Sequence, residues 1–295
     1  MFKRILVPTD GSTLAERAFP LAERIALSQG ARVVIGRVVP PMTWMGYDPT
    51  AYGSPDLYQE LFDAMDEECQ QDLNRVAERF RAAGIETVTE MQHGVPGAAL
   101  LDLEDRIHPD LVVMGTHGRS GLARFAMGSI ADLMAREGTA PVLLVRAFAP
   151  SLTPLLSALV PLDGSVLAES ALPMGEALAI RPVAEVQLLR AVNVESDRAM
   201  AGLYLDRIAD RLRAFGVKVS TTVEVGPATE VIARAAERVD LVVISTHGRG
   251  GFERVRYGSV ATEAIRNLAT PTLLVRVRPP ANLAVRSQDA AEVLV

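Results

Sequence analysis

Residues 8–26 read PTDGSTLAERAFPLAERIA, and residues 161–179 read PLDGSVLAESALPMGEALA. Eleven of these nineteen aligned positions are identical. Further along, THGRSG at 116–121 matches THGRGG at 246–251, and APVLLVR at 140–146 matches TPTLLVR at 270–276. A sequence that repeats itself in this way contains two copies of one structural unit. We therefore predict two domains, residues 1–148 and residues 153–279, followed by a C-terminal tail at 280–295.

Each copy alternates short apolar runs with segments of helical periodicity. In the first copy, the apolar runs predict strands at 4–10, 31–39, 85–93, 110–116 and 140–146. Helical spacing of apolar residues predicts helices between them, including a long one over 57–80. Strands that alternate with helices form a parallel sheet covered on both faces. The predicted fold class is α/β, with two tandem doubly wound, Rossmann-like domains, each a five-stranded parallel sheet flanked by helices.

The composition excludes several classes of protein. The chain of 295 residues is 49% hydrophobic and 22% charged, with a net charge of −6, so bulk electrostatics do not favour binding to nucleic acid or to an anionic membrane. Cys69 is the single cysteine and the four histidines are dispersed, which argues against a disulfide and against a zinc site. No apolar run approaches the length of a signal peptide core or a membrane helix, so we expect a cytoplasmic protein.

A glycine-rich loop follows the predicted strand at 110–116. Its spacing is Gly115, two residues, Gly118, nine residues, Gly128-Ser129, with Ile130 opening a helix. Glycines let the backbone approach a ligand closely, and the first N–H groups of a helix attract phosphate. Glycine-rich turns also occur without any ligand. Here the loop recurs in the second copy, and each first strand ends in an aspartate, Asp10 or Asp163, which favours a nucleotide site.

With Val7-Pro8-Thr9-Asp10 at the first strand and this glycine pattern at the fourth, the sequence resembles the universal stress protein family, in particular tandem members of the ATP-binding type. The resemblance implies that Asp10 and the backbone near Val38 hold adenine, that Gly115 lies by the ribose, and that the later glycines hold phosphates. His117 is expected either to stabilise the turn or to contact a phosphate. Arg119 is expected either to contact the γ-phosphate or to be solvated. The candidate nucleotide-binding residues of domain 1 are Pro8, Thr9, Asp10, Val38, Met114, Gly115, His117, Gly118, Arg119, Gly128, Ser129 and Ile130.

The second copy departs from this pattern at two positions. Ser245 replaces the first glycine of the loop, and Leu162 replaces Thr9. Domain 2 therefore either binds a nucleotide in a more crowded site or is a degenerate copy kept for packing. Its candidate residues are Asp163, Ala191, Ser245, Gly248, Gly258, Ser259 and Val260.

The pattern predicts a stress-response or regulatory protein that binds ATP, with Mg²⁺ or Mn²⁺ carried on the phosphates. We assign no catalytic residue and no protein metal ligand. A loop of the form G-x4-G-K-[ST] does not occur, so a P-loop ATPase is disfavoured. The alternatives are an enzyme that hydrolyses ATP slowly and a nucleotide-free structural dimer. By the same resemblance, the apolar fifth strands of the two copies are expected to pair, and two chains to form a homodimer.

Overall fold

The computed structural model describes residues 2–45, 55–116, 127–146, 155–180, 183–247, 262 and 267–277. The elements of domain 1 are β1 (Arg4–Pro8), α1 (Phe19–Gln29), β2 (Arg32–Val39), α2 (Pro55–Ala82), β3 (Thr87–His93), α3 (Pro96–Ile107), β4 (Leu111–Gly115), α4 (Ser129–Glu137) and β5 (Val142–Val145). Those of domain 2 are β6 (Ser157–Pro161), α5 (Val166–Glu169), α6 (Leu172–Ile180), β7 (Glu185–Val192), α7 (Arg198–Ala214), β8 (Lys218–Val225), α8 (Ala228–Ala236), β9 (Leu241–His247) and β10 (Thr272–Val277). Short 3-10 helices lie at Ala15–Ala18, Met42–Met45 and Glu195–Asp197.

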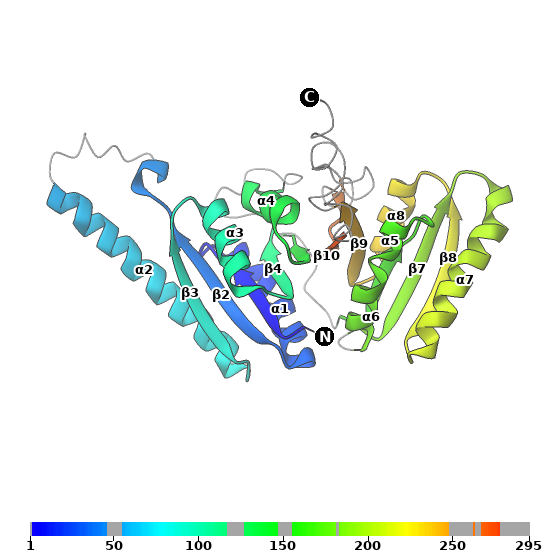
Figure 1. Ribbon diagram of the computed structural model, residues 1–295, viewed down its shortest axis with the longest axis horizontal. Helices are drawn as coiled ribbons and strands as arrows, with labels where there is room; N and C mark the ends of the chain where they lie inside the picture. Colours follow the sequence, from blue (N-terminus) through cyan, green and yellow to red (C-terminus); the bar gives the residue numbers. More distant parts are fainter. Residues whose placement is uncertain are drawn as a thin grey trace, which may run out of the picture.

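All ten strands belong to one sheet, which runs through the molecule from β3 at one end to β8 at the other (Figure 1). The strand order is β3-β2-β1-β4-β5-β10-β9-β6-β7-β8. Within each domain the neighbouring strands are parallel, as the alternation of strands and helices predicted. The strand order reverses next to β1 and again next to β6, and such switch points are where ligands bind in this class of fold.

The two domains meet through their fifth strands. β5 and β10 pair antiparallel, with Leu143 opposite Leu273. This confirms the predicted contact between fifth strands, here formed within one chain. The further pairing of two chains into a homodimer stays a prediction.

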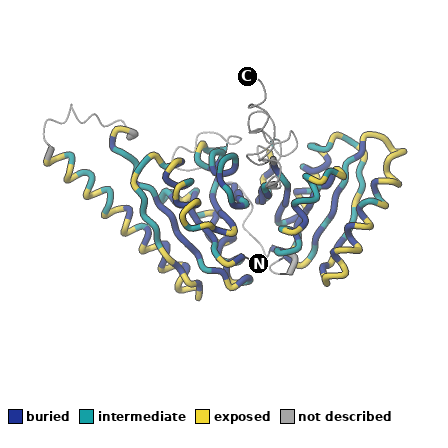
Figure 2. Tube along the Cα trace, viewed as in Figure 1, coloured by how far each residue is buried: buried dark blue, intermediate teal, exposed yellow. Residues whose placement is uncertain are grey.

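Each sheet face has its own apolar layer, because successive side chains of a strand point to opposite faces. Ile5 and Val7 of β1 pack with α1 and α2, whereas Leu6 packs with α3 and α4. All three side chains are fully buried, which explains why the strands of the sequence read as continuous apolar runs. The buried residues follow the strands and the inner faces of the helices (Figure 2).

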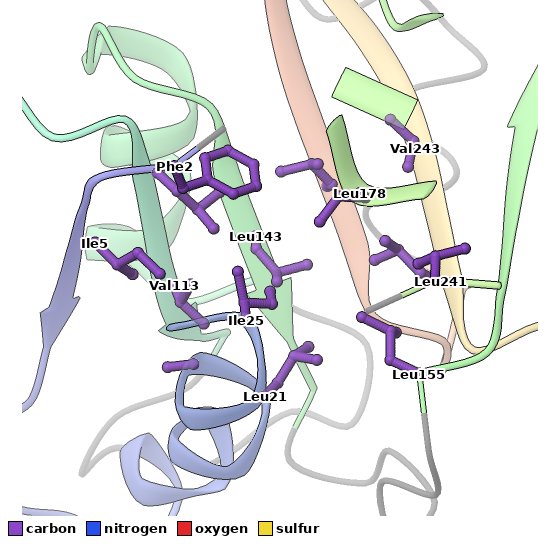
Figure 3. Close-up of a cluster of buried hydrophobic side chains, with 14 of the residues drawn as sticks. Phe2, Ile5, Leu21, Ile25, Val113, Leu143, Leu155, Leu178, Leu241 and Val243 are labelled. Atoms are coloured by element: carbon purple, nitrogen blue, oxygen red, sulfur yellow. The ribbon is translucent and has the colours of Figure 1, made fainter. Parts of the chain in front are cut away.

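One apolar cluster continues from domain 1 into domain 2. Leu21, Ile25 and Leu143 come from domain 1, and Leu155, Leu178 and Leu241 come from domain 2 (Figure 3). The interface between the domains is therefore built like an interior and holds the two sheet halves as one body.

Two helices of domain 1 show local details that the sequence prediction did not specify. The segment after Asp10 begins with a 3-10 turn, and α1 starts only at Phe19, directly before Pro20. Proline is favoured in the first turn of a helix, which fits this late start. The apolar stripe predicted over 57–80 is deeply buried from Cys69 to Phe80, while Leu57 is 40% exposed. Among the described residues, no helix is both long enough and apolar enough to cross a membrane.

Candidate functional site

The turn after β1 is built by short-range hydrogen bonds. Thr9 donates its N–H to the carbonyl of Gly36 at 2.8 Å, which continues the pairing of β1 with β2 for one more residue. The Ser12 N–H donates to Oδ1 of Asp10 at 3.0 Å, and the Gly11 N–H donates to Oγ1 of Thr9 at 3.1 Å. Aspartate and threonine side chains that bond to backbone two residues on form tight turns. The turn holds Asp10 at the carboxyl end of the sheet.

A second polar element comes from the junction of β4 and α4. The Gly128 N–H donates to the carbonyl of Thr116 at 2.6 Å, so the two ends of the connecting loop lie together. Gly128 is the N-cap of α4 and has no side chain to cap it. The first N–H groups of a helix lack partners within the helix, and together with the helix dipole they favour an anion. Ser129 and Ile130 thus place the first turn of α4, a position that favours an anion, at the edge of the sheet.

The β1 turn and the start of α4 line the same cavity, which has a volume of about 420 Å³. Its walls come from the ends of β1, β2 and β4 and from the facing parts of α2, α3 and α4. A cavity of this size is typical of small-molecule sites. The lining consists of Pro8, Thr9, Asp10, Ala15, Arg37, Val38, Val39, Pro40, Met65, Glu68, Cys69, Pro96, Leu100, Met114, Gly115, Thr116, Gly128, Ser129, Ile130 and Ala131. Every candidate residue of domain 1 that lies within the described ranges is in this lining.

Several candidates lie outside the described residues. These are His117, Gly118 and Arg119 in domain 1 and Gly248, Gly258, Ser259 and Val260 in domain 2. Their assignment stays a prediction.

An ion pair forms the wall between β2 and α2. Arg37 of β2 is 5% exposed, and its guanidinium pairs with the carboxylate of Asp72. The carboxylate of Glu68 lies 3.8 Å from the same guanidinium. A buried arginine is held in place when its charge is paired and hydrogen-bonded. Arg37 and Glu68 therefore bring fixed charges to the cavity lining.

Cys69 lies beside this wall and is 2% exposed, although it borders the cavity. Burial raises the pKa of its thiol, and the carboxylates of Asp66 and Asp72 act in the same direction. The positive charge of Arg37 opposes this effect only in part. The thiol is therefore neutral at physiological pH, and neutral thiols react slowly.

Domain 2 repeats the aspartate–serine part of this turn, in which the Ser12 N–H donates to Asp10 and the Ala15 N–H donates to Oγ of Ser12 at 3.1 Å. The bond to Thr9 has no counterpart, because Leu162 has no side-chain acceptor. The Ser165 N–H donates to Oδ1 of Asp163 at 2.9 Å, and the Ala168 N–H donates to Oγ of Ser165 at 3.0 Å. Burial works to raise the pKa of Asp163, but hydrogen bonds from Ser165 and the charge of Arg190 outweigh it, so the pKa lies below its ordinary value. Ala191 and Ser245 are half-buried on β7 and β9, the strands that flank β6.

The wall of domain 2 differs from that of domain 1. When the buried positions of α7 are matched to those of α2, Tyr204 takes the place of Asp72. The guanidinium of Arg190 lies over the ring of Tyr204, 4.9 Å from its centroid. The Tyr204 hydroxyl donates to Glu169 at 3.0 Å. With Leu162 buried where domain 1 has Thr9, these changes make the strand ends of domain 2 more apolar.

Sequence reasoning missed the part of the cavity that α2 provides. The predicted site residues did not include Met65, Glu68 and Cys69 of α2, nor Arg37 of the neighbouring β2. One signal was available, since an arginine occupies the same place in both copies, Arg37 and Arg190, each directly before a candidate residue. Among the described residues, no group of three or more His, Cys, Asp or Glu side chains is placed to hold a metal ion.

Comparison with known proteins places the chain in a family. The family model described as "Universal stress protein family" matches residues 1–146 and again residues 157–276. A universal stress protein of Methanocaldococcus jannaschii is 35% identical over 146 residues, which is 50% of this chain and 83% of that protein. The domain boundaries expected from the sequence, residues 1–148 and 153–279, stay predictions.

Solved structures show the same fold over nearly the whole chain. A universal stress protein from Archaeoglobus fulgidus aligns with a TM-score of 0.72 at 20% identity, over 92% of this chain and 98% of that one. A protein of unknown function from Pseudomonas aeruginosa aligns with a TM-score of 0.66 at 16% identity, over 93% of this chain and 92% of that one. Two matches to one family model along a single polypeptide mean that this chain belongs to the universal stress protein family, as a member with two domains in tandem.

Proposed function

We propose that domain 1 binds an adenine nucleotide, with ATP as the expected ligand, and that the chain acts as a nucleotide-dependent regulatory protein. The observation that carries this proposal is the cavity that joins the Asp10 turn to the uncapped start of α4. One end offers a carboxylate and the apolar side chains of Val38 and Met114, which suit a flat base with an amino group. The other end offers helix N–H groups, which suit phosphate.

Within this proposal, Asp10 and the backbone near Val38 contact adenine and Gly115 lies beside the ribose. Gly128, Ser129 and Ile130 bind the phosphates, together with Gly118 of the connecting loop. Mg²⁺ or Mn²⁺ would travel with the phosphates. Domain 2 binds nucleotide more weakly, because Leu162 and Tyr204 remove polar groups that domain 1 has at these places.

The direct test is to identify and titrate the ligand. Mass spectrometry of the supernatant of heat-denatured protein should detect an adenine nucleotide. Calorimetry of protein freed of nucleotide should show tighter binding for ATP than for GTP, because the Asp10 carboxylate accepts a hydrogen bond from an amino group and would repel the carbonyl oxygen of guanine. Absence of both co-purified nucleotide and binding heat at millimolar ATP would contradict the proposal and leave a scaffold without ligand.

Cys69 provides an independent probe, since it is the single cysteine of the chain and borders the cavity. ATP should slow its alkylation by iodoacetamide roughly tenfold when free ATP is about ten times its dissociation constant. Without ATP, the rate should rise with pH and give an apparent pKa above the ordinary value of a cysteine thiol, because burial disfavours the thiolate. Alkylation in denaturant, where ATP should have no effect, is the control. Unchanged alkylation in a sample that binds ATP would place the nucleotide away from this cavity.

A further inference from the structure

An arginine of domain 2 binds the C-terminal end of α4, the domain 1 helix whose first turn lines the cavity. Arg276 belongs to β10, and its guanidinium donates to the carbonyl of Met134 at 3.0 Å and to those of Ala135 and Gly138. These carbonyls belong to the last turn of α4 and the residue after it. The last carbonyls of a helix lack partners within the helix, and a cation there also balances the helix dipole.

A second buried charge holds the same loop from within domain 1. Glu104 of α3 is fully buried, and its Oε1 accepts hydrogen bonds from the N–H groups of Thr139 and Ala140, each at 2.6 Å. The loop after α4 is thus held between a carboxylate of domain 1 and a guanidinium of domain 2. Only small movements of this end of α4 are possible without breaking these bonds.

The other end of α4 lies in the cavity. The helix has nine residues, so its two ends are separated by roughly 13 Å at 1.5 Å per residue. A helix this short moves as a rigid unit. A shift or tilt at Gly138 therefore changes the direction of the N–H groups at Ser129 and Ile130.

The repeat shows that this arginine has a counterpart. Arg146 follows β5 and occupies in domain 1 the place that Arg276 has in domain 2. Arg146 is 8% exposed, and desolvation lowers the pKa of its guanidinium. Each of the two strands that join the domains is therefore accompanied by an arginine, buried at Arg146 and half-buried at Arg276.

We propose that Arg276 is a positioning residue for the nucleotide site of domain 1, so that contact with domain 2 sets how tightly domain 1 holds phosphate. This rests on the proposed function and deepens it, because it makes the site dependent on both domains. Arg276 does not touch the cavity, and it acts through the orientation of α4. Since coupling is reciprocal, binding of phosphate at α4 also strengthens the contact between the domains.

The test compares ligands with and without phosphates. Arg276→Gln should weaken ATP binding in calorimetry roughly tenfold, within the 5–150-fold that couplings between sites commonly span. Adenosine, which does not reach the α4 N–H groups, should bind with unchanged affinity. Arg234→Gln is the matched control, because Arg234 is a domain 2 arginine whose exposed ion pair with Glu224 does not involve domain 1. This control should bind ATP and adenosine like the wild type.

A second variant covers the case in which Arg276→Gln does not fold. Arg276→Lys keeps a cation at the end of α4 and should bind ATP about threefold more weakly, again without an effect on adenosine. An ATP affinity equal to the wild type in the folded variants, or an equal loss for ATP and adenosine, would overturn the proposal. If the wild type itself binds neither ligand, the proposed function fails, and that outcome is recognisable before any variant is measured.

Discussion

Asp10→Ala is expected to bind ATP roughly 10- to 150-fold more weakly than the wild type, the factor that corresponds to 1.5–3 kcal/mol for a hydrogen bond to a charged group. The carboxylate follows β1 and lines the cavity on the side proposed for adenine. Its loss leaves a donor of the base without a partner in a cavity whose lining is mainly apolar. The measurement is calorimetric titration of ATP at constant pH and salt.

A control must separate this effect from a general loss of stability, because Asp10 also accepts the N–H of Ser12 and thereby stabilises the end of β1. Asp110→Ala serves this purpose. The Asp110 carboxylate accepts the N–H groups of Lys3 and Arg4, at 2.7 and 2.9 Å, at the opposite end of β1. This variant should lose stability but keep ATP affinity. If Asp10→Ala instead bound ATP more tightly, the triphosphate rather than the base would lie against this carboxylate, and our orientation of the ligand would be wrong.

Gly11→Ala is expected to lower the free energy of unfolding by about 3 kcal/mol, the upper part of the usual range for point substitutions. Gly11 has φ +78°, a conformation that costs other residues about 1–2 kcal/mol. A Cβ at this position would overlap the carboxylate of Asp72 and come within 2.9 Å of Nη1 of Arg37. The substitution therefore adds displacement of the buried ion pair to the backbone strain. Urea unfolding of the variant and the wild type measures the difference.

Two other glycines separate these contributions. Gly30 has φ +63°, and a Cβ there would meet nothing within 4 Å, so Gly30→Ala should cost only about 1 kcal/mol of strain. At Gly164, the counterpart of Gly11 in domain 2, the nearest atom would be Nη1 of Arg190 at 3.1 Å. Its substitution should give an intermediate loss. Equal losses at all three positions would show that the ion pair of the wall adjusts freely.

The two domains share one fold, but the residues between the second strand and the long helix differ between them. Arg37 and Arg190 share a position, but the first pairs with a carboxylate and the second with an aromatic ring. Partial burial of the Tyr204 hydroxyl and its hydrogen bond to Glu169 raise its pKa, so it remains a neutral donor throughout the physiological range. The asymmetry is the reason we expect the nucleotide in domain 1.

The amino-acid sequence alone was sufficient to predict the fold class, the internal repeat and the residues at the strand ends that line the cavity. The strands can be recognised as continuous apolar runs, because successive residues such as Ile5 and Leu6 are buried on opposite faces of a parallel sheet. The residues that follow these strands, Asp10 and Gly115 among them, must then gather at one sheet edge. The pairing of the fifth strands could also be expected, since both are apolar and would otherwise expose an edge.

Only the tertiary structure decided which side chains complete the cavity and what holds α4, the helix whose first turn lines it. Cys69 and Leu73 both read as core positions of a long helix, and periodicity does not tell which of them also borders a cavity. The contact of Arg276 with α4 joins residues about 140 positions apart, and its β10 strand carries no local mark of a partner in the other domain. Hydrophobic periodicity and helix caps involve residues that are close in the sequence, so they can be recognised from it. Contacts between distant segments depend on how whole domains pack, and become visible only once the sheet is assembled.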